Sequence, residues 1–148
     1  VKQGADLHSS TFDQLVANEY MEQYDIDANI ARILVAYRKR RDVMVEALEV
    51  EMPEGVTFSR PEGGLFLWVT LPEGIDARKM LELALKRNLA FVPGGSFFPE
   101  KNRENTLRLN FSNMPEERIV EGVRRLAAVL KECMANAAAA SVEESAVK

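Results

Sequence analysis

The 148 residues carry a net charge of −4, and their content of 47% hydrophobic and 28% charged residues is typical of a globular domain. No basic run is long enough to follow a phosphate backbone and no apolar segment approaches 18 residues, so we expect neither nucleic-acid binding nor a membrane span. The only cysteine, Cys133, excludes an internal disulfide and, without a visible signal peptide, favours a cytoplasmic location.

The first part of the chain is predicted to be helical. It starts with Val1 rather than Met, and residues 1–10 read as the interior of a longer sequence, so we expect a piece of a larger protein. Residues 11–21 have apolar side chains near helical spacing. Asp27 suits the N-cap of a long amphipathic helix that runs to about Val50.

Strands and helices alternate in the remainder of the chain. The predicted strands are residues 56–59, 65–71, 89–92 and 106–112. The turn sequences PEGG, at 61–64, and PGG, at 93–95, follow the first and third of these strands. One helix is expected from Asp76 to about Asn88, and a closing helix is expected to begin at Pro115.

This order of elements predicts an α+β fold, with a small and mainly antiparallel sheet and helices packed on one face. We expect the domain to span residues 26–134, after a connecting segment at residues 1–25. Residues 135–148 are small and polar, without apolar periodicity beyond Met134, which predicts a frayed helix end and a disordered tail.

The strand TLRLNFS, at residues 106–112, has an arginine at its centre. Its alternation places Leu107, Leu109 and Phe111 on the core side and Arg108 on the opposite side, with Asn110. Because an antiparallel sheet often has one solvated face, contact with water is a sufficient explanation of Arg108 from this segment alone.

Motifs for covalent or phosphate chemistry are missing from the sequence. The only histidine, His8, is distant from Cys133 and fits a loop or capping residue better than a metal or nucleophile site. No glycine-rich nucleotide-binding motif occurs. The glycine pairs at 63–64 and 94–95 either form turns that need positive φ or allow a close backbone approach to a ligand.

Three blocks of sequence resemble a known family. RPEGGLFLWVTLP at 60–72, FVPGGSFF at 91–98 and NTLRLNFS at 105–112, followed by MPEERIVEGVRRLAAVL, resemble the C-terminal small domain of fold-type I (class I/II) pyridoxal-phosphate-dependent aminotransferases. The sequence is most similar to the branch that acts on 2-aminoadipate, kynurenine, aromatic and branched-chain amino acids. The resemblance covers about residues 1–130 and includes the opening KQGADLHSSTFDQLV.

The resemblance implies that Arg108 binds the α-carboxylate of an amino-acid substrate, because the arginine of the corresponding strand does so in this family. A guanidinium offers a planar, bidentate grip on a carboxylate, and a rigid strand holds it in place. Asn110 would lie beside it, and Gly64 would bring backbone to the substrate unless the PEGG turn is purely structural. His8 and Ser9 would approach the active site of the partner subunit, unless they form a plain interdomain linker.

The resemblance also implies what this chain lacks. Transamination needs pyridoxal phosphate, a lysine that binds it and groups that hold its ring and phosphate. In this family those groups belong to a large domain that precedes the position of Val1, and none of the seven lysines here has the expected serine–lysine motif. We therefore expect a fragment that is inactive alone, docks on its own large domain, and comes from a homodimeric enzyme that transfers an amino group from an L-amino acid to a 2-oxo acid.

One alternative of a different class stays open. The same fold and the same blocks occur in the effector-binding domain of a class of bacterial transcription regulators, so the parent protein could be a regulator. A winged-helix segment upstream of the aminotransferase-like region would favour that alternative.

Overall fold

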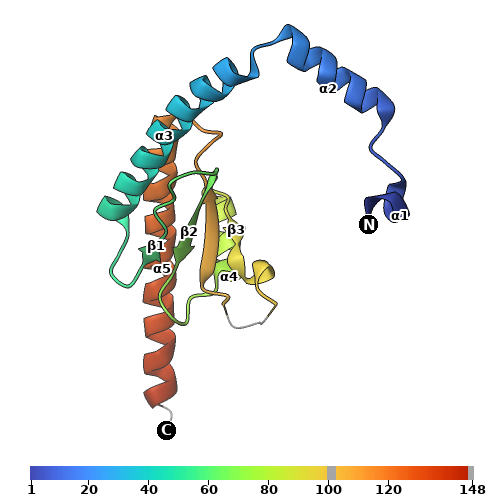
Figure 1. Cartoon of the computed structure of the whole chain (residues 1–148). Helices are drawn as coiled ribbons and strands as arrows, with labels where there is room; N and C mark the ends of the chain where they lie inside the picture. The colour runs from blue at the N-terminus through green and yellow to red at the C-terminus, as the bar shows by residue number, and fades with distance from the viewer. Residues whose placement is uncertain (100–102, 147–148) are drawn as a thin grey trace. The chain divides into compact units, whose positions relative to one another are not determined.

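The computed structural model describes residues 1–99 and 103–146 and divides the chain into two compact units, residues 1–35 and 36–148 (Figure 1). The first unit contains α1 (Lys2–Asp6), α2 (Thr11–Gln23) and the first turns of α3 (Ile26–Glu51). The second unit contains the rest of α3 and all later elements. Within the described residues, no helix is both long and apolar enough to cross a membrane.

The first unit is helical and has no buried residue. Ser10 caps α2 by accepting a hydrogen bond at Oγ from the backbone N of Asp13, 3.4 Å away. The cap of α3 differs from the sequence prediction, because Asp25 Oδ1 accepts the bond from Ala28 N at 2.8 Å. Asp27 lies instead in the first turn of the helix, where its charge favours the helix dipole.

A four-stranded antiparallel sheet forms the centre of the second unit. Its strands are β1 (Thr57–Phe58), β2 (Phe66–Thr70), β3 (Val92–Pro93) and β4 (Thr106–Asn110), in the order β1-β2-β4-β3. β4 therefore lies between β2 and β3, and its residue Arg108 pairs with Trp68 on one side and with Val92 on the other. The predicted α+β class with an antiparallel sheet is confirmed.

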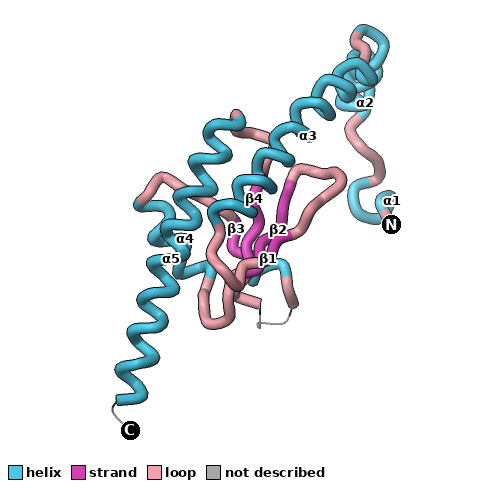
Figure 2. The backbone as a smooth tube through the Cα atoms, turned by 90° about the vertical axis from the view of Figure 1, so that its left-hand side faces the viewer, coloured by secondary structure: helices cyan, strands magenta, loops and turns pink. Residues whose placement is uncertain are grey.

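The helices cover one face of this sheet. Leu67 and Val69 of β2 and Leu107 and Leu109 of β4 are buried in one apolar cluster with residues from α3, α4 (Ala77–Lys86) and α5 (Glu116–Ala146). In Figure 2, α4 and α5 lie to the same side of the strands. The alternation of β2 and β4 then directs every second side chain away from this core, which is the face that carries Arg108.

The end of α4 displaces the third strand from its predicted position. Asp76 caps α4 as predicted, with its Oδ1 accepting bonds from Arg78 N and Lys79 N. At the other end, Leu89 N donates to Ala84 O at 3.0 Å and Asn88 has a φ of 54°, which closes the helix as a left-handed C-terminal turn. This turn uses residues that the sequence assigns to a strand at 89–92, so β3 starts only at Val92.

α5 is longer than the sequence predicts. It runs from Glu116 to Ala146, through most of the segment at 135–148 that was expected to be disordered. Four consecutive alanines at 137–140 have the highest helix propensity of any residue, which offsets the lack of an apolar stripe. The last two residues of the predicted tail, 147 and 148, lie outside the described part.

Candidate functional site

Arg108 lies on the face of the sheet opposite the apolar core, between two aromatic rings. Its Cζ is 4.0 Å from the centroid of the Phe66 ring and 4.8 Å from that of Phe97. Phe66 belongs to β2 and Phe97 to the 3-10 helix η1 (Gly94–Phe97), which follows β3. Because β4 lies between β2 and β3, the two rings approach the guanidinium from the two sides of its strand.

The guanidinium of Arg108 has no hydrogen-bond acceptor within residues 1–99 and 103–146. Its Nε is buried without a hydrogen-bond partner, and the only other described side-chain atom in that state is Arg40 Nε, which lies at ion-pair distance from Glu116. A buried donor without an acceptor costs about 1–3 kcal/mol. Arg108 is half-buried, so water can reach its terminal nitrogens but not Nε. A cation without an acceptor beside aromatic rings is suited to binding an anion.

Trp68 contacts Phe97, one of the two rings that lie against Arg108. Its indole makes edge-to-face contacts with Phe97 and Phe98, with ring centroids 5.7 Å apart in both cases. Next to it, Thr106 is buried and its Oγ1 donates a hydrogen bond to Arg103 O at 2.8 Å. η1 thus packs against Trp68 and Thr106.

Gly94 allows η1 to approach Trp68 and Thr106 closely. A Cβ atom on Gly94 would lie 2.7 Å from Trp68 Cζ2 and 2.9 Å from Thr106 Cβ, which no ordinary packing tolerates. A Cβ on Gly95 would lie 2.8 Å from Glu104 Cδ. Neither residue has a positive φ. The glycine pair is therefore explained by close approach, here to the chain itself, and not by a turn that needs positive φ.

Gly64 and Asn110, the two other predicted substrate contacts, have local structural roles. Gly64 has a φ of 79°, a conformation that favours glycine, and a Cβ added to it would meet no atom within 4 Å. Asn110 lies on the same face as Arg108, but its Oδ1 accepts hydrogen bonds from Ser112 N at 2.7 Å and Ser112 Oγ at 2.8 Å. These bonds shape the turn after β4.

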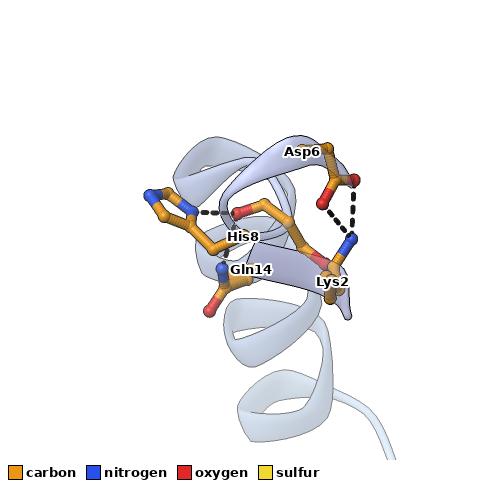
Figure 3. Close-up of polar contacts among 5 residues, drawn as sticks. Lys2, Asp6, His8 and Gln14 are labelled. Atoms are coloured by element: carbon orange, nitrogen blue, oxygen red, sulfur yellow. Dashed lines mark hydrogen bonds and ion pairs between the residues drawn. The ribbon is translucent and has the colours of Figure 1, made fainter. Parts of the chain in front are cut away.

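His8 and Ser9 belong to the first unit, and their hydrogen bonds are local to it. His8 Nδ1 lies 2.6 Å from Ser9 O, so this nitrogen is the one that carries the proton, and Gln14 Nε2 donates to the same carbonyl at 2.8 Å (Figure 3). Nearby, Lys2 and Asp6 form an exposed ion pair with a distance of 2.7 Å. Arg108, Gly64 and Asn110 thus belong to the second unit, and His8 and Ser9 belong to the first.

Arg40 is a residue of the second unit that the sequence did not single out. Its Nη1 donates to Ser112 O, and its Nε is 3.8 Å from Glu116 Oε1. Arg40 therefore ties the segment between β4 and α5 to α3. Its position three residues after Tyr37 and four before the buried Met44 places it on the inner side of the helix. This spacing could have identified Arg40, but it falls within the basic run at 38–41, which the sequence analysis treated as one group.

The five described lysines are exposed. They are Lys2, Lys39, Lys79, Lys86 and Lys131. The other two lysines, at 101 and 148, fall outside the described residues. The described part of the chain contains no cluster of side chains that could bind a metal ion.

A groove of about 920 Å³ lies beside β4, where β3 begins. Residues 88–92, Arg108, Asn110 and the first turns of α5 line it. Phe66 and Phe97, the two rings that contact the guanidinium, do not belong to this lining. The groove therefore adjoins the candidate site, because both include Arg108.

The chain belongs to the family of class I and II aminotransferases, whose signature matches residues 2–126. It is 50% identical over 133 residues to aromatic-amino-acid aminotransferase 1 of Thermococcus litoralis, a match that covers 90% of this chain and 32% of that protein. The chain spans about a third of the length of the curated relatives it matches. The resemblance found in the sequence is therefore confirmed.

Solved structures of this family have the same fold. The multiple substrate aminotransferase of Thermococcus profundus superposes with a TM-score of 0.82 at 51% identity, covering 91% of this chain and 34% of that one. The α-aminoadipate aminotransferase of Thermus thermophilus, in complex with N-(5'-phosphopyridoxyl)-L-leucine, gives a TM-score of 0.80 at 42% identity, covering 90% of this chain and 34% of that one.

A more distant relative is an uncharacterised HTH-type transcriptional regulator of Bacillus subtilis, with 26% identity over 132 residues, 89% of this chain and 27% of the regulator.

Proposed function

We propose that this chain is the C-terminal domain of a pyridoxal-phosphate-dependent aminotransferase, in which Arg108 binds the α-carboxylate of the amino-acid substrate. The observation that carries the proposal is the Arg108 guanidinium, which is unpaired among the described residues and lies between two aromatic rings. Membership of the aminotransferase family supplies the ligand that such a cation would take. A carboxylate would bind the two terminal nitrogens together in a bidentate pair.

The chain contributes binding and orientation to this reaction. Arg108 would hold the substrate through a group that does not react, which fixes the position of the α-carbon. Asn110 and the backbone at Gly64 would border the bound substrate. Pyridoxal phosphate, when bound, supplies the electron sink for transfer of the amino group to a 2-oxo acid, and its lysine would come from the large domain.

The parent protein would be a cytoplasmic homodimer that acts on L-amino acids and 2-oxo acids. The relatives from Thermococcus litoralis and Thermus thermophilus are named for aromatic amino acids and for 2-aminoadipate, which supports substrates with large side chains. In such a dimer, His8 and Ser9 would approach the active site of the partner subunit.

Substitution of Arg108 in the full-length parent enzyme tests the proposal. Hydrogen bonds to charged groups contribute about 1.5–3 kcal/mol each, so loss of the bidentate pair should cost about 2–4 kcal/mol and lower kcat/KM in Arg108→Ala by about thirty- to a thousandfold. Arg108→Lys should recover only part of this loss, because a lysine lacks the second donor and the plane. On an amine without an α-carboxylate, wild type and Arg108→Ala should react at similar rates. Equal impairment on both substrates would overturn the proposed role of Arg108.

Labelling with the cofactor tests whether the isolated chain is inactive. Because the described lysines are exposed, incubation with pyridoxal phosphate and reduction with borohydride should label several of them weakly. Peptide mapping by mass spectrometry would detect the modified positions. Stoichiometric labelling of one lysine would contradict the prediction that the cofactor lysine lies in another domain.

A second candidate function is the effector-binding domain of a transcription regulator. The similarity to an HTH-type regulator, over 89% of this chain, supports it. The higher identity to aminotransferases favours the enzyme. The sequence of the parent gene discriminates the two functions, because a winged-helix segment before the aminotransferase-like region is expected only for a regulator.

A further inference from the structure

We propose that Phe97 is a positioning residue for Arg108, and that it holds the guanidinium against Phe66 so that the nitrogen edge of the cation meets the substrate carboxylate. This inference rests on the proposed role of Arg108 and adds a second residue, from a different element, to the same site. It assigns a function to η1, the short helix that follows β3.

The contact geometry points to a function beyond packing. The side chains of Phe66 and Phe97 are 41% and 49% exposed, so neither contributes a large buried area to the core. Both nevertheless lie within 5 Å of the Arg108 Cζ, at 4.0 and 4.8 Å from their ring centroids. A guanidinium at such distances is attracted to the face of an aromatic ring. The contact that the two rings have in common is the one with Arg108.

Phe97 is itself held in place by the sheet. Trp68, which pairs with Arg108 across β2 and β4, meets the Phe97 ring at an interplanar angle of 80°. The absence of a side chain on Gly94 allows the start of η1 to lie against Trp68 and Thr106. The position of the Phe97 ring is thus determined by the same two strands that carry Phe66 and Arg108.

Two consequences for substrate binding follow from this arrangement. Rings on both sides of β4 restrict rotation of the guanidinium, which favours a bidentate geometry with the carboxylate. The rings also replace part of the water around the guanidinium, which strengthens the attraction of its terminal nitrogens to an anion. A leucine at position 97 would keep the apolar bulk but lose the aromatic face, so the cation would be oriented less well.

The test compares Phe97→Leu with Phe97→Tyr and with a matched control in the full-length parent. Phe58→Leu is the control, because Phe58 also contacts a guanidinium, that of Arg60 at 5.5 Å, but lies in β1. We expect Phe97→Leu to lower kcat/KM about three- to thirtyfold on an amino acid, mainly through KM, with no effect on an amine that lacks the α-carboxylate. Phe97→Tyr should keep nearly full activity, and Phe58→Leu should leave the enzyme unchanged.

A second measurement tests the geometry without catalysis. In the 148-residue chain, the Arg108 Nε–Hε signal in an NMR spectrum should be shifted by the aromatic ring currents, and Phe97→Leu should move it toward the value of a solvated arginine. Phe58→Leu should not move it. An unchanged signal in Phe97→Leu, or equal loss of kcat/KM on both substrates, would overturn the inference.

The kinetic and NMR results also separate this inference from the proposed function. If Arg108→Ala has no effect that depends on the α-carboxylate, the proposed function fails, and the positioning role for substrate binding fails with it even where the NMR shift is present. If Arg108→Ala acts as expected and Phe97→Leu does not, only the role of Phe97 is overturned.

Discussion

Replacement of Arg108 by methionine separates a functional arginine from a structural one. The substitution removes two contacts between the guanidinium and aromatic rings, each worth about 0.5–1 kcal/mol at partly exposed positions. It also removes a buried, unpaired Nε, whose burial costs about 1–3 kcal/mol. Because the loss and the gain nearly cancel, Arg108→Met should change the free energy of unfolding by no more than about 1 kcal/mol, or should increase it.

Leu109→Ala provides the matched comparison, because Leu109 is the next residue of β4 and faces the core. This substitution should destabilise the chain by about 2–5 kcal/mol. Urea unfolding of the 148-residue chain measures both variants, with circular dichroism as the signal, because Trp68 fluorescence would itself respond to changes near Arg108. Destabilisation of Arg108→Met by more than about 2 kcal/mol would refute the reasoning and make Arg108 a structural residue.

Two further predictions concern α5. Gly122→Ala should stabilise the chain by about 0.5–1 kcal/mol, since a Cβ there would meet only Leu89 Cδ1 at 4.0 Å, and a lower urea midpoint would contradict this. Burial, and then the charge of Glu132, raise the pKa of the Cys133 thiol, while Arg87 lowers it. Alkylation of Cys133 by iodoacetamide at pH 8 should therefore become faster in Glu132→Gln and slower in Arg87→Gln, and a change in the opposite direction in either variant would count against this assignment.

The strands that form the centre of the fold were predictable because their signals are local. The alternation in TLRLNFS identified β4 and the face of Arg108, and Asp76 was identified as the cap of α4. The wrong predictions came from competition between neighbouring signals. Asp25 and Asp27 are both good N-caps, and only the geometry at Ala28 selects Asp25. The residues after α4 were assigned to a strand because their apolar side chains concealed the turn at Asn88.

The surroundings of Arg108 were not predictable in the same way. Phe66 and Phe97 belong to separate segments of the chain, and they meet the guanidinium only because β2 and η1 flank β4. The glycine pair before Phe97 indicated either a turn that needs positive φ or a close approach, and the sequence alone did not distinguish the two. Gly64 has the positive φ that a turn glycine suggests, whereas Gly94 is needed for its missing side chain. That distinction depends on Trp68 and Thr106, which a linear pattern does not connect to Gly94.

The most direct measurement of the central claim is a crystal structure of the full-length parent with an N-(5'-phosphopyridoxyl)-amino acid bound. We predict that the carboxylate of this compound lies on the Arg108 guanidinium, with two nitrogen–oxygen distances of about 2.7–2.9 Å. The rings of Phe66 and Phe97 should still cover the cation. A carboxylate bound by another cationic side chain, with Arg108 turned away from the compound, would contradict the account.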